Sequence, residues 1–283
     1  MIVEAAGLRF HALTDGPDDG PLVLLLHGFP ELGRSWRHQL PALAEAGFRA
    51  VAPDLRGYGD TDARGPYDLR TLAGDVESLV AALGHDRATV VGHDWGGVIA
   101  WASAHLHPHR VERLVILNAP HPVLMRRKLT ASVDQRRRSR YALWFQVPLL
   151  PERQLSRGGA AQIARALRGG SHVREAWPPE ELEHYRRAFD EPRKLRGPLA
   201  YYRTAFRRAL LRRGPRLPGR IEAPTLVLWG MRDRFLDPAL ADEGLERFVR
   251  ELTVVRIEDA GHFVQNEAPE RVNAELVGWL QAT

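Results

Sequence analysis

The 283 residues, 44% of them hydrophobic and 27% charged, have the composition of a folded globular protein, which excludes intrinsic disorder as the general state of the chain. The absence of cysteine excludes disulfide bonds and thiolate metal sites and suits a reducing compartment. The 40 basic and 35 acidic side chains nearly balance, but residues 121–220 hold 24 basic and 8 acidic ones, so the rest of the chain carries a net charge of −11.

We expect no secretory signal in the N-terminal segment, MIVEAAGLRFHAL. It carries Glu4 and no basic residue ahead of its short apolar run, unlike a secretory signal peptide. No apolar stretch approaches the roughly 20 residues that a membrane-spanning helix needs. We therefore expect a soluble, cytoplasmic protein.

Short apolar runs alternate with segments of helical periodicity along most of the chain. Strands are predicted at Leu22–Leu26, Ala50–Ala52, Thr89–Val91, Leu114–Leu117, Thr225–Trp229 and Thr253–Ile257. Helices are predicted at Leu72–Leu83, Val98–Leu106 and Leu240–Val249. This alternation is typical of an α/β protein, in which helices cover both faces of a mostly parallel sheet.

The alternation stops between residues 121 and 220. This segment shows no strand pattern, several arginine-rich amphipathic stretches and many prolines. We interpret it as an all-helical lid (cap) of residues 121–220, inserted into a core domain formed by residues 1–120 and 221–283. Its basic charge would suit nucleic-acid binding, but we favour a solvated face of helices, since charge runs usually solvate helices.

The turn at Asp94 joins the predicted strand in VVGHDWGGVIA to the helix that follows. A dinucleotide-binding turn requires glycine where Asp94 stands, and a carboxylate there would repel phosphates. A nucleophile elbow, G-x-S-x-G, needs small residues two positions on either side of the nucleophile, and Gly92 and Gly96 provide them. A simple helix N-cap is the third interpretation. We favour the elbow, with Asp94 in the place of serine.

Five motifs extend this interpretation to nearly the whole chain: HGFP at 27–30, DLRGYGDTD at 54–62, GHDWGG at 92–97, WGMRD at 229–233 and GHFVQNEAPE at 261–270. In them the sequence resembles the α/β-hydrolase superfamily, and within it the epoxide hydrolases with an aspartate nucleophile. The resemblance implies an α/β-hydrolase fold, with a mostly parallel eight-stranded sheet and an inserted helical lid. HGFP together with GHDWGG narrows the field to epoxide hydrolases and haloalkane dehalogenases. Thr61 stands where the family more often has serine.

An aspartate nucleophile suits an electrophilic sp3 carbon. A serine that attacked such a carbon would end as a stable ether, whereas aspartate forms an ester that water can hydrolyse. Ester hydrolysis needs a general base and a carboxylate that orients it. The resemblance assigns the base to His262 and the orienting acid to Asp233, in the superfamily order of nucleophile, acid and base.

Two other positions were weighed for the acid. Asp237 precedes Pro238 and is better interpreted as the N-cap of a helix. Some relatives carry the acid after the strand that corresponds to LVILN, but this sequence has Asn118 at that position.

The resemblance also assigns binding groups. It places the oxyanion-stabilising N–H groups on Phe29 and Trp95, and we expect Phe29, Trp95 and Phe263 to contact the substrate. Tyr141 in RYALWFQVP and Tyr202 in RGPLAYYRT match the two lid tyrosines that activate an epoxide oxygen. Packing within the lid is the alternative role for both tyrosines.

The sequence therefore predicts an epoxide hydrolase that forms a vicinal diol through an ester on Asp94, with no cofactor and no metal. Its expected partners are a small lipophilic epoxide and water, without nucleic acid, in a monomer or homodimer. A haloalkane or fluoroacetate dehalogenase with the same residues, and a non-catalytic ligand-binding protein, are the alternatives. The apolar stretch LWFQVPLL at 143–150 would allow the basic lid to dock on an anionic membrane, but we favour the inner face of the lid for it.

Overall fold

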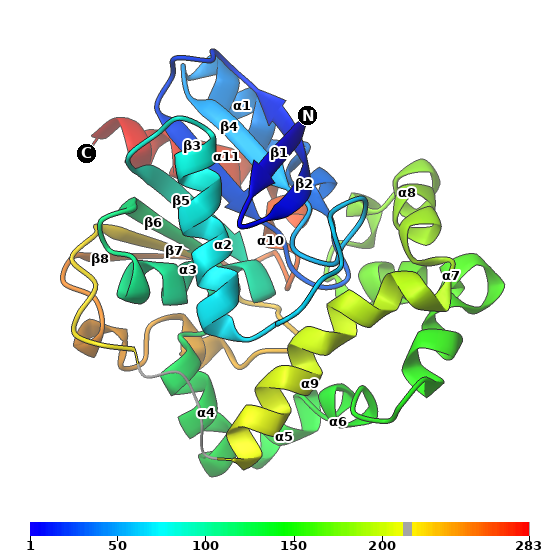
Figure 1. Ribbon diagram of the computed structural model, residues 1–283. Helices are drawn as coiled ribbons and strands as arrows, with labels where there is room; N and C mark the ends of the chain where they lie inside the picture. Colours follow the sequence, from blue (N-terminus) through cyan, green and yellow to red (C-terminus); the bar gives the residue numbers. More distant parts are fainter. Residues whose placement is uncertain (212–216, 283) are drawn as a thin grey trace.

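The computed structural model describes residues 1–211 and 217–282, so residues 212–216 of the expected lid lie outside the described part. An eight-stranded sheet with the order β1-β2-β4-β3-β5-β6-β7-β8 forms the core (Figure 1). Its strands are β1 (Ile2–Ala5), β2 (Leu8–Asp15), β3 (Leu22–Leu26), β4 (Arg49–Pro53), β5 (Ala88–His93), β6 (Val111–Leu117), β7 (Thr225–Gly230) and β8 (Leu252–Ile257).

Neighbouring strands are parallel from β4 to β8, whereas the β1–β2 and β2–β4 pairs are antiparallel. All six predicted strands are present, which confirms the α/β fold class. The β1–β2 hairpin was not among the predicted runs. Its signal in the sequence is a period of two, because Leu8, Phe10 and Ala12 of β2 are buried while the residues between them are not.

Helices cover both faces of the sheet. Helices α1 (Gln39–Glu45) and α11 (Pro269–Ala282) pack on one face with Val23 and Leu25 of β3, while α2 (Leu69–Ala82) and α3 (Trp95–Leu106) pack on the other. The side chains of a strand point to alternate faces, so a strand that is covered twice must be apolar throughout. Each fully buried leucine of this kind stabilises the fold by about 1.5–3 kcal/mol.

The helix predicted at Leu240–Val249 is wrong. This stretch forms two short 3-10 turns, η4 (Pro238–Ala241) and η5 (Leu245–Arg247). Gly244 lies between them with φ of 84°, a left-handed conformation that ends a right-handed helix. Asp237 caps η4 as expected, since its carboxylate accepts a hydrogen bond of 3.0 Å from the Ala239 N–H.

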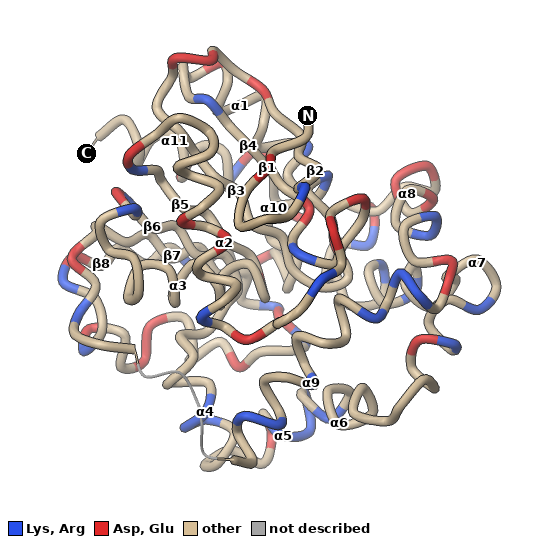
Figure 2. The backbone as a smooth tube through the Cα atoms, in the orientation of Figure 1, with Lys and Arg blue, Asp and Glu red and all other residues tan. Residues whose placement is uncertain are grey.

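Between β6 and β7 the described residues form helices and turns but no strand. We call residues 121–220 the lid; it contains α4 (Pro122–Ala131), α5 (Val133–Arg138), α6 (Tyr141–Trp144), α7 (Leu150–Gly170), η2 (Arg174–Ala176), α8 (Pro179–Phe189), η3 (Pro192–Leu195) and α9 (Arg196–Leu210). Helices α6 to α9 gather beside the layered core in Figure 1. Figure 2 shows the lysines and arginines of the lid spread over several of these helices.

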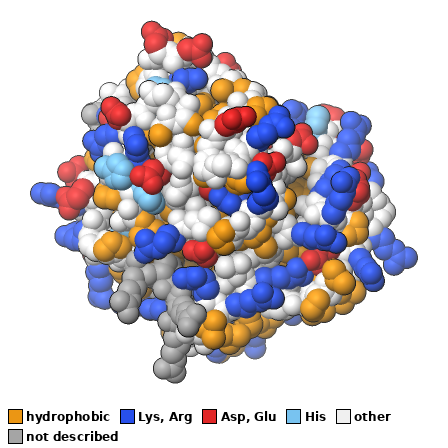
Figure 3. Space-filling view, in the orientation of Figure 1, with side chains coloured by type: hydrophobic (Ala, Val, Ile, Leu, Met, Phe, Trp, Pro, Cys, Tyr) orange, Lys and Arg blue, Asp and Glu red, His pale blue; other side chains and the backbone are white. Residues whose placement is uncertain are grey.

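The apolar stretch at 143–150 does not line the inner face of the lid, contrary to our expectation. Leu143, Val147, Leu149 and Leu150 are 60%, 41%, 53% and 44% exposed, and only Phe145 is buried. Helix α6 is a single turn and can direct only part of its surface inward. Apolar side chains accordingly appear between basic ones along the lower edge of the molecule in Figure 3.

Two buried histidines lie where the lid leaves and rejoins the core. His121 begins α4, and its Nδ1 accepts a hydrogen bond from the Val123 N–H. His105 Nδ1 lies 3.0 Å from the Pro218 carbonyl oxygen, and the two Nε2 atoms are 3.0 Å apart. Since a carbonyl can only accept, these contacts fit one arrangement, in which both rings are neutral and His121 donates to His105.

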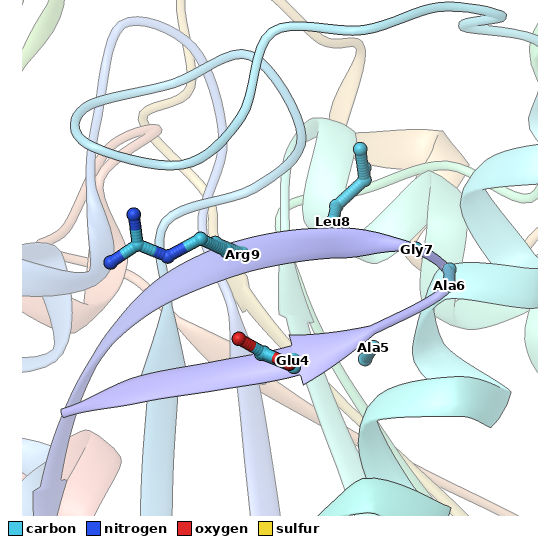
Figure 4. A pocket seen from close by; sticks show the side chains of 6 residues that line it. All are labelled: Glu4, Ala5, Ala6, Gly7, Leu8 and Arg9. Atoms are coloured by element: carbon cyan, nitrogen blue, oxygen red, sulfur yellow. The ribbon is translucent and has the colours of Figure 1, made fainter.

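A shallow hollow beside the β1–β2 turn is lined by residues 4–9 (Figure 4). None of the expected site residues lies there. Within the described part of the chain, no helix has the length and apolar character that crossing a membrane requires.

Candidate active site

Asp94 stands at a sharp turn between β5 and α3. Its φ of 48° and ψ of −118° are strained for a residue with a side chain. A Cβ atom on Gly92 would lie 2.4 Å from the Gly96 carbonyl oxygen, and one on Gly96 would lie 2.1 Å from the Leu26 carbonyl oxygen. Only glycine fits at both positions, so the sequence pattern around Asp94 reflects a tight turn that holds a carboxylate at the end of the sheet.

Three predicted residues meet at this turn. The Asp94 carboxylate accepts a hydrogen bond of 3.0 Å from the Phe29 N–H through Oδ1. Its Oδ2 lies 3.6 Å from His262 Nε2, which is longer than a hydrogen bond but within ion-pair range. The other ring nitrogen, Nδ1, is 2.8 Å from Asp233 Oδ2. His262 is thus aligned between two carboxylates that come from separate strand ends.

The charges of Asp94, His262 and Asp233 depend on one another. Burial by itself opposes the charged form of His262, yet the neighbouring carboxylates of Asp233 and Asp94 outweigh it and hold the pKa of His262 well above its ordinary value. Burial likewise opposes ionisation of both carboxyl groups, but contact with His262 keeps the pKa of each below its usual range. The resting site therefore holds one imidazolium between two carboxylates.

The Asp233 carboxylate is fully engaged by hydrogen bonds. Its Oδ1 accepts from the N–H groups of Phe235 at 2.7 Å and Leu236 at 3.0 Å. Its Oδ2 accepts from Asn118 Nδ2 at 2.8 Å as well as facing His262. These donors fix the orientation of the carboxylate, and therefore of the imidazole that it holds.

Solvent reaches the opposite side of Asp94. The Asp94 side chain is 17% exposed, and Phe29, Trp95 and Tyr141 beside it are also partly exposed. Trp95 is the first residue of α3, where backbone N–H groups lack an acceptor within the helix. A substrate that occupied this space would lie against the carboxylate and against the N–H groups of Phe29 and Trp95.

The two lid tyrosines lie together across this space. The ring of Tyr202 packs 5.1 Å from that of Trp95, 5.6 Å from that of Phe29 and 6.0 Å from that of Tyr141, measured between centroids. Burial raises the pKa of both phenols, and the nearby negative charge of Asp94 raises it further. Both tyrosines therefore keep their protons at neutral pH and remain hydrogen-bond donors.

Two other aromatic residues, Tyr201 and Phe263, are buried. Tyr201 is buried and donates a hydrogen bond of 2.9 Å to the Arg56 carbonyl oxygen, which ties the lid to the core. Phe263, expected to contact the substrate, is buried between His262 and Trp177, with centroid distances of 5.0 and 5.4 Å.

Comparison with known proteins shows which family the chain belongs to. The model of the alpha/beta hydrolase fold family matches residues 21–269. The AB hydrolase superfamily protein YfhM of Bacillus subtilis is 33% identical, over 99% of this chain and 97% of that protein. Epoxide hydrolase 3 of Xenopus tropicalis is 37% identical, over 98% of this chain and 76% of that protein. The crystal structure of a Bacillus megaterium epoxide hydrolase in complex with an inhibitor superimposes with a TM-score of 0.89 at 28% identity, covering 99% of this chain and 100% of that one.

The chain belongs to the α/β-hydrolase family. Asp233 remains the candidate for the acid, because it contacts His262, whereas Asp237 caps η4 and pairs with Lys128 at 2.9 Å. Asn118 occupies the alternative acid position and contributes an amide to Asp233.

Sequence reasoning missed a buried pair of side chains, His93 and Glu31, beside the candidate nucleophile Asp94 of this α/β-hydrolase. His93 Nδ1 lies 2.6 Å from Glu31 Oε2, and its Nε2 lies 2.8 Å from the His262 carbonyl oxygen. Glu31 also accepts from the Gly28 N–H at 3.2 Å, so the pair joins the loops that carry Phe29, Asp94 and His262. His93 lies within GHDWGG and Glu31 directly follows HGFP, but no spacing in the sequence indicates that they touch.

Proposed function

We propose that this α/β-hydrolase converts an epoxide to a vicinal diol through a covalent ester on Asp94. The observation that carries the proposal is the placement of a strained, accessible carboxylate between a His262–Asp233 pair and two protonated lid tyrosines. The relatives named as epoxide hydrolases support the substrate class. The expected substrate is a small lipophilic epoxide, since aromatic rings surround the accessible space.

In the first step an Asp94 oxygen bonds to a ring carbon while the carbon–oxygen bond of the epoxide breaks. The ring oxygen takes its proton from Tyr141 or Tyr202, and the phenolate that remains is stabilised by the hydroxyl of the other tyrosine. This donation is necessary because an alkoxide is a poor leaving group in an apolar site. The product is a hydroxyalkyl ester of Asp94.

Formation of the ester prepares the second step. Esterification removes the negative charge of Asp94, one of the two charges that raise the pKa of His262, so the imidazolium gives up its proton more readily, and this proton passes to the phenolate left by the first step. Neutral Nε2 then accepts a proton from water, and the resulting hydroxide attacks the carbonyl carbon of the ester. The N–H groups of Phe29 and Trp95 stabilise the oxyanion of the tetrahedral intermediate.

Collapse of this intermediate breaks the bond to the alkyl oxygen. The departing alkoxide takes the proton held by His262 and leaves as the diol. The carboxyl group regenerated on Asp94 gives its proton to the neutral imidazole of His262, which restores the imidazolium and the two carboxylates of the resting enzyme. The sum is addition of one water molecule to the epoxide.

The test is the intact mass of the His262→Gln variant after incubation with terminal epoxides and, separately, with haloalkanes. Without the base, the ester should accumulate, and an added mass equal to the whole epoxide supports the proposal. An alkyl adduct that lacks the halogen, formed with haloalkanes alone, would indicate a dehalogenase instead. Absence of any adduct, with the folded state verified by circular dichroism, would contradict nucleophilic catalysis by Asp94.

A further inference from the structure

The loop that carries the candidate acid is held by the lid as well as by the core. We call residues 233–237 the acid loop. Arg138 of α5 donates a hydrogen bond of 2.9 Å to the Asp233 carbonyl oxygen. Gln135 of the same helix donates from Nε2 to the Phe235 carbonyl oxygen at 2.8 Å and accepts from the Asp237 N–H at 2.9 Å. A single lid helix therefore contacts the acid loop at both ends and at its centre.

Gln135 is suited to hold this loop in one position. Its side chain is fully buried, and both ends of its amide bond to backbone atoms of the acid loop. Its Nε2 also donates to the Ser139 hydroxyl, which fixes the amide against its own helix. Removing the amide would leave the loop's carbonyl and N–H groups without partners in a buried interface, where each such group costs about 1–3 kcal/mol.

The acid loop that α5 contacts also lies between the core residue His262 and the lid residue Tyr141 of the candidate site. The ring of Phe235 lies 5.0 Å from that of His262 and 5.9 Å from that of Tyr141, measured between centroids. Helix α5 is followed directly by α6, which begins with Tyr141. A displacement of α5 would therefore move a lid tyrosine and the support of the acid together.

We propose that Gln135 is a positioning residue that clamps the acid loop to the lid, so that Asp233 is held against His262 only while α5 is seated on the loop. The Asp233 carboxylate depends on this loop for its other bonds, because its Oδ1 accepts from Phe235 and Leu236. If the clamp is removed, the loop carbonyl and N–H groups turn toward other partners, and the 2.8 Å contact with His262 lengthens. The role of this clamp in catalysis rests on the function proposed above.

The test compares Gln135→Met with Gln146→Met. Methionine preserves the length of the side chain and removes the amide. Gln146 is a matched control, because it lies in the same lid but its amide donates to the Ala142 carbonyl oxygen of its own helical turn. In protein labelled with 15N-histidine, NMR titration gives the pKa of the His262 imidazole in the absence of substrate.

We expect Gln135→Met to lower the pKa of His262 by about one unit, because the imidazolium loses part of its interaction with Asp233. Gln146→Met should leave it unchanged. In single-turnover experiments, Gln135→Met should hydrolyse the ester about tenfold more slowly while forming it at the wild-type rate. Gln135→Glu retains the acceptor for the Asp237 N–H. Its pKa for His262 and its rate of ester hydrolysis should both lie between those of the wild type and of Gln135→Met.

An unchanged titration and an unchanged hydrolysis rate in Gln135→Met would reduce Gln135 to a packing residue. Equal effects in both methionine variants would attribute the change to general loosening of the lid and would overturn the proposal. If Gln135→Met does not fold, Arg138→Met is tested in its place. This substitution removes the hydrogen bond to the Asp233 carbonyl oxygen, and Arg138 is less buried than Gln135. If the wild type forms neither ester nor diol, the proposed function fails, but the NMR titration still decides whether the clamp exists.

Discussion

The core and the lid contribute to the candidate site in different ways. Asp94, Asp233 and His262 follow strand ends of the core, where a continuous sheet fixes their spacing. Tyr141 and Tyr202 lie on helices of the lid, which is held to the core by ion pairs such as Arg34–Glu181 and by side-chain hydrogen bonds. In the function proposed here, the core supplies the residues that form and hydrolyse the ester, whereas the position of the lid decides whether a substrate oxygen meets the two phenols.

The sharpest test of this division is to remove the candidate nucleophile of the core. Asp94→Asn should lower epoxide turnover at least about 10⁴-fold, because the asparagine amide cannot form the ester proposed for Asp94. Diol formation by gas chromatography measures this loss, and circular dichroism serves as the control for folding. Activity that returns slowly together with a mass increase of about one dalton would indicate deamidation to aspartate.

Substitution of the two lid tyrosines tests the contribution of the lid to the candidate site. Replacing one of Tyr141 and Tyr202 by phenylalanine should slow ester formation about 10²-fold, and replacing both should abolish it, because each supplies a hydrogen-bond donor to the developing alkoxide. Stopped-flow tryptophan fluorescence follows this step.

Tyr201→Phe is the control for the lid tyrosines. It removes a structural hydrogen bond to the Arg56 carbonyl oxygen and should reduce the free energy of unfolding by about 1 kcal/mol without slowing ester formation. Full activity of the double variant Tyr141→Phe/Tyr202→Phe would assign those residues to packing alone.

The cohesion of the lid depends on Arg203. This α9 residue pairs with buried Glu152 at 2.6 Å and donates to the carbonyl oxygens of Phe145 and Val147. Arg203→Met leaves the Glu152 carboxylate buried without its partner and should lower the free energy of unfolding by about 3 kcal/mol. Urea denaturation measures the loss.

The matched control is Arg193→Met, which removes an exposed pair with Glu191 and should change stability by less than about 1 kcal/mol. Hydrogen exchange should accelerate in residues 141–152 of Arg203→Met and not in the central strands. Uniform acceleration would show that lid and core unfold as one unit.

The junction between the two regions should be sensitive to acid. Burial lowers the pKa of His105, and burial with the nearby charges of His105 and Arg127 lowers the pKa of His121 to about 3. The unfolded chain protonates both residues near pH 6.5, whereas the folded chain protonates each of them only at a lower pH, which for His121 is about 3. The contribution of these two histidines to stability should therefore be present above about pH 6.5 and should fall as the pH decreases, for His121 down to about pH 3, by at most about 1.4 kcal/mol per pH unit for each histidine.

His121→Asn removes one titrating group and keeps a helix-capping side chain. Urea denaturation between pH 4 and 7 should give a shallower dependence of stability on pH for this variant than for the wild type. An equal dependence would place the acid-sensitive groups elsewhere.

The sequence predicts the core better than the lid for a physical reason. Strands buried on both faces must be apolar throughout, and the turn at Asp94 requires glycines at fixed positions, so both leave local signals. The exposure of Leu143 and the clamp by Gln135 depend on which helices pack together, and no local pattern carries that information. Gly244 is a local signal for the end of a helix. The apolar spacing over Leu240–Val249 nevertheless predicts one helix, whereas the structure has two 3-10 turns.

The turn that presents Asp94 also bears on how such an enzyme changes its chemistry. The contacts that require Gly92 and Gly96 involve backbone atoms, and the Val98 N–H bonds to the backbone oxygen of residue 94, so the turn itself does not depend on the Asp94 side chain. A serine at this position would fit the same backbone and would attack acyl groups instead of saturated carbon. The same backbone turn can therefore present either type of nucleophile, and the side chain at position 94 decides which class of electrophile it can attack.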